Sequence, residues 1–167
     1  ILYFETNKKS INCEDIEKEI EGDIFIFPTT HRSEKGVQSL TVHYPGNFNE
    51  AKLGGKEKTL VKAPSSLLKD LFLELKKLYK GEVSMEATHH GPFTKKPSIF
   101  IEIGSSEKEW KDPNLGQIIA KTLLNVVGKE NKYKTVVVLG GGHYGQRCNQ
   151  ILEKTNYTVG HHCPKHN

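Results

Sequence analysis

Apolar positions recur along the chain at two spacings, one typical of strands and one typical of helices. Short apolar runs bounded by turn residues predict strands at 23–27, 39–43, 82–87, 98–103, 134–139 and 157–160. Leucines at helical spacing predict a helix over 65–79, and further helices are expected over 12–20, 112–127 and 144–154. Strands that alternate with helices predict an α/β fold with a mixed, largely parallel sheet and helices on both of its faces.

Two of these strands carry more specific expectations. Pro28 directly follows the apolar run at 23–27 and is expected to end that strand, because proline has no N–H group for the ladder. The run at 134–139 is almost continuously apolar, which predicts a strand that is buried on both faces.

Length and composition indicate the class of protein. The 167 residues, of which 35% are hydrophobic and 26% charged, fit a single α/β domain over residues 1–167. Apolar runs are a few residues long, so no membrane-spanning helix is expected. The chain begins with Ile1 and stops soon after its last strand, which predicts a fragment that lacks N- and C-terminal parts of the full chain.

Charge and cysteine content narrow the function classes further. The formal net charge of +4 permits contact with nucleic acid without demanding it. Arg32 and Arg147 are the two arginines, and a guanidinium can clamp a phosphate or a carboxylate. Three cysteines without CxxC spacing, and no secretory leader, favour a reduced compartment and a cytoplasmic protein.

Histidines gather at the ends of the predicted strands. Seven of the eight lie at or just after an apolar run, namely His31, His43, His89, His90, His143, His161 and His162. Ligands of open α/β sheets bind beyond the carboxyl ends of the strands, so we expect several imidazoles to converge at one edge of the sheet. Histidine titrates near neutral pH and suits proton transfer, although a single histidine is often a surface or hydrogen-bonded core residue.

Glu86 stands close in sequence to two of these histidines. With His89 and His90 it could form a base and its orienting carboxylate, or a metal site. The spacing is not HExxH, so the alternative is a carboxylate that merely orients His89. The glycines at 140–142 precede His143 and a helix, and they could either cradle an anion with their N–H groups or form a flexible turn.

The strand-end segments also carry a family resemblance. They read THRS at 30–33, SLTVHYPGN at 39–47, MEATHHGP at 85–92, IEIGSSEKEW at 101–110, GGGHYGQR at 140–147 and GH at 160–161. Together they resemble the archaeal- and plant-type D-aminoacyl-tRNA deacylases, from about residue 24 to residue 161. Gly145 and Gln146 depart from the GGGHYAPR-like run of that family.

This resemblance implies a three-layer α/β sandwich similar to the nucleoside phosphorylase and peptidyl-tRNA hydrolase group. It implies a hydrolase that cleaves the ester bond between a D-amino acid and the 3′-terminal ribose of tRNA. The partner would be tRNA charged with a D-amino acid. Zinc is associated with the family, and Glu86, His89 and His90 are the candidate ligands.

The resemblance and the chemistry of the residues together suggest roles. His89 or His90 would act as the base, with Glu86 as the orienting acid and His143 as an oxyanion or substrate contact. Further substrate contacts are expected from His31, Arg32, His43, Glu102, Gly141, Gly142, Arg147 and His161. No serine lies in a GxSxG motif and no cysteine lies in a recognised nucleophile context, so direct attack by water is favoured.

Two other classes of function stay open on the sequence. One is another hydrolase or phosphorylase on a similar fold, either zinc peptidase-like or nucleoside phosphorylase-like. The other is a non-catalytic tRNA-binding domain, which the 8% aromatic content and the lack of a base-stacking motif disfavour.

Overall fold

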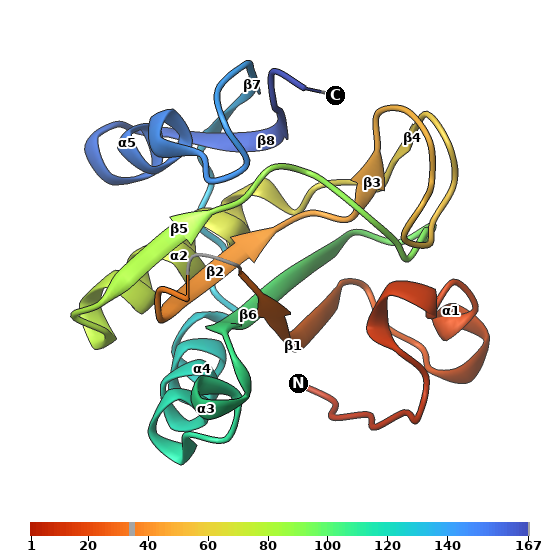
Figure 1. Cartoon of the computed structure of the whole chain (residues 1–167), viewed down its shortest axis with the longest axis horizontal. Coiled ribbons are helices and arrows are strands. Elements are labelled where there is room, and N and C mark those ends of the chain that lie inside the picture. Colours follow the sequence, from red (N-terminus) through yellow and green to blue (C-terminus); the bar gives the residue numbers. More distant parts are fainter. Residues whose placement is uncertain (34–35, 167) are drawn as a thin grey trace.

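The computed structural model describes residues 1–33 and 36–166 and has a mixed α/β fold (Figure 1). Its strands are β1 (Phe25–Arg32), β2 (Ser39–His43), β3 (Gly46–Asn47), β4 (Thr59–Leu60), β5 (Glu82–Met85), β6 (Ser98–Ser105), β7 (Lys134–Leu139) and β8 (Tyr157–Cys163). Its α-helices are α1 (Ile16–Glu19), α2 (Ser65–Leu78), α3 (Glu107–Trp110), α4 (Pro113–Val126) and α5 (Gln146–Lys154), and a 3₁₀ turn covers Ser10–Asn12. The predicted α/β class is therefore confirmed.

Four strands form the central sheet, in the order β1-β6-β2-β5. β1 runs parallel to β6 and β2 runs parallel to β5, whereas β2 and β6 are antiparallel. The sheet is thus mixed, as predicted. β7 and β8 form a separate parallel pair, and β3 and β4 form a short antiparallel ribbon.

The two faces of the central sheet differ in chemistry because side chains alternate along each strand. On β6, Ile99, Ile101 and Ile103 belong to the hydrophobic core. The helices α2 and α4 pack against this face of the sheet and contribute the other side of the core. Figure 1 shows α2 behind the sheet. Each buried leucine of α2 contributes about 1.5–3 kcal/mol from apolar burial. The opposite face is therefore open to polar side chains of the same strands.

Proline does not end the first strand, contrary to prediction. β1 continues through Pro28, which pairs in register with Ile101, and it reaches Arg32. β1 is an edge strand, so proline can occupy a position whose N–H would not serve a neighbour. His31 and Arg32 consequently lie within a strand, where alternation decides the direction of each side chain.

The strand at 134–139 is exposed, so the prediction of burial on both faces is wrong. Val137 is 61% exposed and Leu139 is 78% exposed, whereas Val136 and Val138 pack against the core. In the described part of the chain, β7 pairs with β8 on one side, and α5 packs mainly against β8. The apolar run therefore predicted the strand correctly, but it did not show how many faces of that strand are buried.

The helix boundaries are mostly as predicted. Asp112 caps α4 by accepting a hydrogen bond from the Asn114 N–H at 2.9 Å. The expected helix over 12–20 is replaced by a 3₁₀ turn and the short helix α1. None of the helices that the structure describes has the length and apolar character needed to cross a membrane.

Candidate functional site

A row of polar side chains crosses the sheet on the face that lies opposite the core. Thr29 on β1, Glu102 on β6 and Thr41 on β2 occupy neighbouring register positions. The hydroxyl of Thr29 donates to Oε1 of Glu102 at 2.5 Å. His31 follows Thr29 by two residues, so the strand period places it on the same face.

Gly104 makes room for the ring of His31, which pairs with it in register. A Cβ atom at position 104 would lie 2.4 Å from both Cε1 and Nε2 of that ring. A side chain is therefore incompatible with the observed position of the imidazole. The glycine lets His31 lie over β6, close to the carboxylates.

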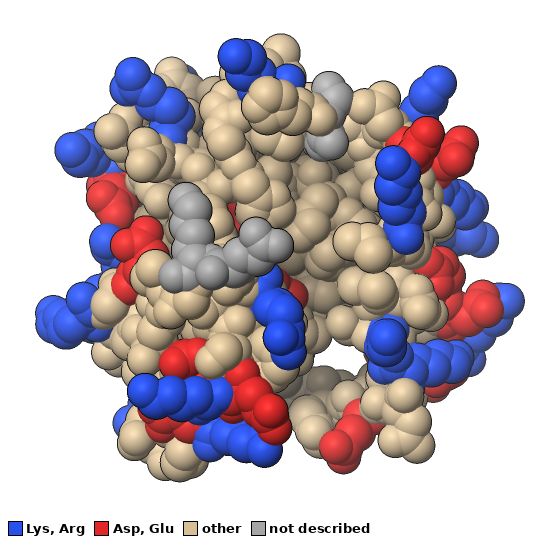
Figure 2. Space-filling view, in the orientation of Figure 1, with Lys and Arg blue, Asp and Glu red and all other residues tan. Residues whose placement is uncertain are grey.

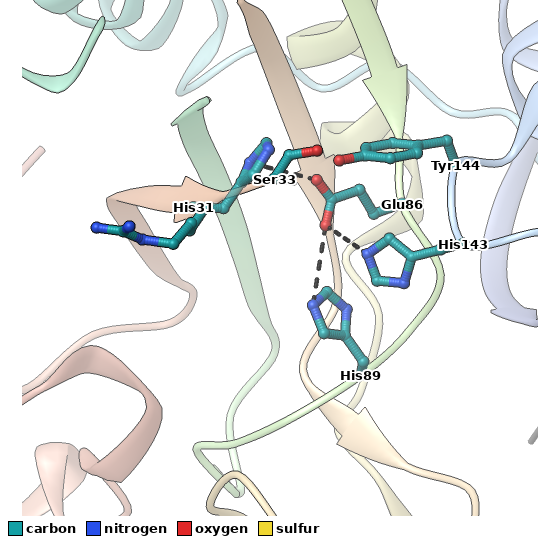
Figure 3. Close-up of a pocket in the computed structure, with 7 residues that line it drawn as sticks. His31, Ser33, Glu86, His89, His143 and Tyr144 are labelled. Atoms are coloured by element: carbon teal, nitrogen blue, oxygen red, sulfur yellow. Dashed lines mark hydrogen bonds and ion pairs between the residues drawn. The ribbon is translucent and has the colours of Figure 1, made fainter. Parts of the chain in front are cut away.

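Glu86 connects three histidines from three parts of the chain (Figure 3). Its side chain is 2% exposed. Oε2 accepts a hydrogen bond from Nε2 of His143 at 3.1 Å and lies 3.8 Å from Nε2 of His89. Oε1 lies 3.4 Å from Nδ1 of His31. Because Glu86 directly follows β5, the strand end positions the carboxylate at the centre of the group.

Glu102 forms a second buried carboxylate centre, on β6. Its Oε2 lies 3.6 Å from Nδ1 of His31 and 3.6 Å from Nε2 of His43. His43 is completely buried and stacks on Phe100, with ring centroids 4.9 Å apart. His31 therefore lies between the two carboxylates, and His43 lies beneath the site.

Three histidines are oriented in the same way by the backbone. Nδ1 of His43, His89 and His90 lies within hydrogen-bond distance of the carbonyls of Tyr44, Ala87 and Gly91, at 3.2, 2.8 and 2.5 Å respectively. When Nδ1 carries the proton and donates it to the carbonyl, Nε2 keeps a lone pair. This tautomer suits a general base or a metal ligand.

The carboxylates and two of the histidines favour each other's charged forms. Burial opposes ionisation of Glu86, but the hydrogen bond from His143 and the charges of His43 and His31 hold its pKa below the ordinary value. Burial likewise disfavours charged Glu102, yet the neighbouring imidazoles of His31 and His43 bring its pKa well below the ordinary value. Burial disfavours protonated His31 and His43, but the carboxylates raise the pKa of both imidazoles.

The other two central histidines stay neutral. Burial, reinforced by the charge of His43, lowers the pKa of His90 to about 4. Burial and the same neighbouring charge hold the pKa of His89 well below its ordinary value. Both imidazoles are therefore neutral at neutral pH and keep a lone pair that a metal ion could take.

A cavity of about 460 Å³ opens above Glu86, within the usual size range for small-molecule sites. It is lined by His31, Arg32, Ser33, Glu86, His89, His143 and Tyr144. Five of these residues were predicted from the sequence, whereas Ser33 and Tyr144 were missed. Figure 3 shows both of these hydroxyl side chains directed toward Glu86. Their adjacency to Arg32 and His143 in the strand-end segments was the available signal.

Several predicted residues lie outside the cavity wall. His43, His90 and Glu102 are packed beneath it. Gly141, Gly142 and Arg147 are exposed, and Arg147 donates to Gln150 at 3.1 Å. His161 lies 3.1 Å from the hydroxyl of Thr88, and its ring contacts Tyr44. The roles of these last four residues stay predictions.

The histidines meet across a face of the sheet, because the strands that carry them end at opposite edges and not at one shared edge. β2 runs antiparallel to β6, so His43 pairs with Phe100 while His31 pairs with Gly104 further along β6. The expected convergence at one edge is therefore wrong in location. Alternation along the strands, rather than parallel strand ends, brings the side chains together.

The donor set fits a transition metal such as zinc. Three groups of residues offer ligand atoms within 4.8 Å of one another: His43, His89 and His90; Glu86, His89 and His143; and His31, Glu86 and Glu102. Among the described side chains, Nε2 of His43 and Oε1 of Glu86 are buried without a hydrogen-bond partner. Imidazole and carboxylate donors are ordinary zinc ligands. The expected trio of Glu86, His89 and His90 is split between two of these groups.

Comparison with known proteins identifies the family. The D-aminoacyl-tRNA deacylase family model matches residues 18–167, and the chain belongs to this family. A D-aminoacyl-tRNA deacylase of Pyrococcus furiosus is 37% identical over 175 residues, which cover 99% of this chain and 65% of that protein. A relative of the same name from Methanosarcina acetivorans is 40% identical over 154 residues, which cover 88% of this chain and 51% of that protein. The chain thus spans between half and two thirds of these relatives.

A solved structure shares the fold. The crystal structure of AF0625, described as a conserved protein of unknown function, superimposes with a TM-score of 0.92 at 34% sequence identity. The match covers 96% of this chain and 61% of that one. The arrangement of strands around Glu86 therefore belongs to a fold already seen by experiment.

Proposed function

We propose that the protein hydrolyses the ester bond that joins a D-amino acid to the 3′-terminal ribose of tRNA. One observation carries the proposal: the Glu86 carboxylate lies within 3.8 Å of imidazoles of His31, His89 and His143 at the base of one cavity. An aminoacyl ester is an activated bond, so a water molecule and a well-placed base suffice to cleave it. Membership of the D-aminoacyl-tRNA deacylase family supports the same reaction.

His89 is the proposed general base. Its Nδ1 faces the Ala87 carbonyl and its Nε2 faces Glu86, which suits removal of a proton from water. The water oxygen bonds to the ester carbonyl carbon, and the bond from that carbon to the ribose 3′ oxygen then breaks. The proton held by His89 passes to the departing 3′ oxygen. Negative Glu86 stabilises the imidazolium that forms in between.

His143 and the glycines before it are the proposed oxyanion contacts. The His143 side chain is 48% exposed and is fixed by its bond to Glu86. Gly141 and Gly142 belong to the same loop and offer backbone N–H groups, which are the usual donors to a developing oxyanion. His90 and the buried pair of His43 and Glu102 support His89 from beneath.

Zinc is the proposed cofactor. His89 and Glu86 each belong to two of the donor groups, and with the ion bound His89 would be a ligand instead of the base, because its Nε2 lone pair cannot serve both roles. When bound, zinc would polarise the ester carbonyl and lower the pKa of a bound water. Glu86 and His90 are then ligands or supports of ligands.

The proposed partner is tRNA charged with a D-amino acid, and the proposed location is the cytoplasm. Arg32 is the proposed contact for the nucleotide end, with His31, which lines the cavity, beside the aminoacyl group. We also propose that residues 1–167 form one domain of a longer chain and that its sheet belongs to a three-layer sandwich of the phosphorylase and peptidyl-tRNA hydrolase type. The 61% coverage of the AF0625 chain supports a longer protein.

Parallel incubations of the full-length protein with D-tyrosyl-tRNA and L-tyrosyl-tRNA test this function. We expect release of D-tyrosine well above the spontaneous rate, little release of L-tyrosine, and loss of the activity on treatment with a chelator. Failure to cleave either substrate, even with added zinc, would refute the proposal. Turnover of peptides or nucleosides instead would indicate the alternative hydrolase or phosphorylase, and salt-sensitive tRNA binding without turnover would indicate a binding domain.

A further inference from the structure

A buried histidine that the proposed reaction does not use lies against the loop before α5. His162 on β8 is 1% exposed, and its Nε2 lies 2.9 Å from the carbonyl oxygen of Gly140. A carbonyl oxygen only accepts hydrogen bonds, so Nε2 carries the proton and donates it, and Nδ1 keeps a lone pair. That Nδ1 is buried without a hydrogen-bond partner among the described residues. The ring therefore gives its one hydrogen bond to this loop.

A β-bulge directs the imidazole inward. β7 and β8 pair Val136 with Val159 and Val138 with His162, so β8 has one extra residue between the two pairs. A bulge of this kind re-aims the side chain that follows it. Val138 packs against the core, and His162 lies opposite it on the same face of the pair. Without the extra residue, the partner of Val138 would be His161.

The imidazole contacts both ends of the glycine loop, which comprises residues 140–145. Nε2 bonds to Gly140, the first residue of the loop. A Cβ atom at Gly145, the last residue, would lie 3.2 Å from Nδ1 of His162, and one at Gly141 would lie 3.8 Å from Nε2. Gly140 and Gly141 have φ angles of 90° and 85°, in the region that favours glycine. The loop therefore bends around the ring.

Two residues of the cavity wall lie between these two contacts. They are His143 and Tyr144, and Nε2 of His143 donates to Oε2 of Glu86 at 3.1 Å. Figure 3 shows both side chains reaching toward Glu86 from the same loop. A shift of Gly140 or Gly145 would therefore move His143 relative to Glu86.

The other bonds that hold the start of the loop are made by the backbone. The Gly140 N–H donates to the Cys163 carbonyl at 2.8 Å, and the Lys165 N–H donates to the Gly141 carbonyl at 2.9 Å. Among the side chains that the structure describes, His162 alone bonds to the backbone of the loop. A substitution at position 162 therefore removes the side-chain contact and keeps the backbone donors and acceptors.

Surface charge does not explain the position of the loop in the described structure. Figure 2 shows charged side chains of both signs mixed around the rim of the face seen in Figure 1. The ion pair that the described residues give this loop is the one between His143 and Glu86. The support from behind the loop is therefore a hydrogen bond from a buried ring and not an ion pair.

We infer that His162 is a positioning residue: its Nε2–H holds Gly140 so that the glycine loop presents His143 to the ester. This inference rests on the proposed function and deepens it by naming a residue behind the proposed oxyanion contact. A contact with the developing oxyanion strengthens in the transition state, so its misplacement lowers kcat and leaves KM nearly unchanged.

Substitutions of His162 in the full-length protein test the hydrogen bond. His162→Leu keeps a buried side chain but removes the donor. We expect its kcat for D-tyrosyl-tRNA to fall by about tenfold or more, while KM changes by less than about twofold. His162→Gln carries an amide group that can donate to the Gly140 carbonyl, so it should restore most of the lost kcat.

Thr158→Val is the matched control, because Thr158 is also a buried donor on β8. Its hydroxyl donates to the Ser65 carbonyl at 2.6 Å, at the start of α2. The variant loses a buried hydrogen bond without touching the glycine loop, so kcat and KM should stay at the wild-type values. Thermal unfolding of all three variants measures the accompanying loss of stability.

Nitrogen-15 NMR of histidine-labelled protein reads the same contact without turnover. In the wild type, the His162 ring should be the tautomer with its proton on Nε2, and that proton should exchange slowly with water because it is buried. In His162→Leu, the ring signals of His143 should change because its bond to Glu86 is disturbed. His162→Gln should return these signals toward those of the wild type.

The results separate the positioning role from the proposed function. Wild-type kcat in folded His162→Leu, or an equal loss of kcat in Thr158→Val, refutes the positioning role and leaves the deacylase activity standing. Failure of folded His162→Gln to restore kcat refutes the hydrogen bond as the cause. If the wild-type protein cleaves neither D- nor L-tyrosyl-tRNA, the proposed function fails, and the His143 signals alone decide whether His162 positions the loop.

A second set of measurements covers the case in which His162→Leu does not fold. A proton on Nδ1 of His162 in the wild type then refutes the inference. A proton on Nε2, together with near-wild-type kcat in His162→Gln, supports it.

Discussion

Nε2 of His143 donates to Oε2 of Glu86 at 3.1 Å, and the carbonyl of His143 accepts the N–H of Ala87 at 2.7 Å. Side chain and backbone thus tie the glycine loop to the segment that follows β5. The loop carrying His143 is therefore part of the site in its observed position. A substitution of Glu86 should therefore alter both the loop that carries His143 and the segment that follows β5.

Replacing His89 by alanine should lower deacylation of D-tyrosyl-tRNA by about 10²–10⁴-fold, the usual contribution of a general base. His166→Ala removes an exposed histidine outside the cavity wall and is the control. Initial rates and circular dichroism of both variants provide the measurement. A folded His89→Ala protein with wild-type rates would remove His89 from the mechanism.

Glu86→Gln should keep the shape of the site but lower activity by about 10²-fold or more, because the carboxylate no longer stabilises an imidazolium. The pKa of His31 should also fall, since the charge of Glu86 contributes to raising it. Rates and an NMR titration of the His31 ring test the two effects together. An unchanged His31 pKa would contradict the contact between the two side chains.

The pairing of Glu102 with His31 and His43 predicts a pH-dependent contribution to stability. The pKa of Glu102 is lowered by folding, so its contribution is present above the ordinary value of 4.5 and is lost as the pH falls through the folded value. The pKa of His31 and His43 is raised, so their contribution is present below the ordinary value of 6.5 and is lost as the pH rises through the folded values. Both conditions hold between these two limits.

Glu102→Gln should therefore destabilise the protein most between pH 4.5 and 6.5. Breaking a buried ion pair costs about 3–5 kcal/mol when one charge is left behind. The free energy of unfolding is measured by denaturant titration at several pH values for wild type and variant. Glu107→Gln, at an exposed carboxylate, gives the baseline. A difference that does not vary with pH would show that the pair is not charged.

Gly104→Ala should displace the His31 ring, because the added Cβ would lie 2.4 Å from two of its atoms. We expect a loss of about 1–3 kcal/mol in the free energy of unfolding and a fall in activity. Gly116→Ala on α4 is the matched control, since its Cβ would meet nothing within 4 Å. The control should be neutral or more stable by up to about 1 kcal/mol. Equal behaviour of the two variants would contradict the close approach at Gly104.

Zinc content should depend on His89, which, like Glu86, belongs to two of the three possible donor groups. Elemental analysis of wild type, His89→Ala and His166→Ala, each purified without chelator and incubated with zinc, measures this dependence. We expect near-stoichiometric zinc in the wild type and in His166→Ala, and a clear loss in His89→Ala. Retention of zinc by His89→Ala would assign the ion elsewhere.

The sequence predicted the elements of the central sheet more readily than their relations. Isoleucine at every second position of β6 is visible in the sequence, and the face bearing Glu102 follows from it. The antiparallel pairing of β2 with β6 is not visible in the sequence, because register depends on partners that are distant in the chain. The expected convergence at one edge failed for this reason, although most of the predicted histidines did converge.

Residues that act through geometry were the hardest to find. Gly104 matters because of its position opposite His31, and Trp110 at the end of α3 matters because its Nε1–H donates to the His31 carbonyl at 3.0 Å. Neither has a sequence pattern that indicates its neighbour. Pro28 misled the prediction because its cost depends on whether the strand is at an edge, which is a property of the sheet and not of the segment.

On β6, isoleucines that hold the helices and the glutamate that serves the cavity stand on opposite sides of one backbone, a single residue apart. A change in the packing of these isoleucines would therefore shift the carboxylate of Glu102 on the other face. Selection for a stable core and selection for activity at the site therefore act on the same few residues of β6. A substitution in this strand affects both properties.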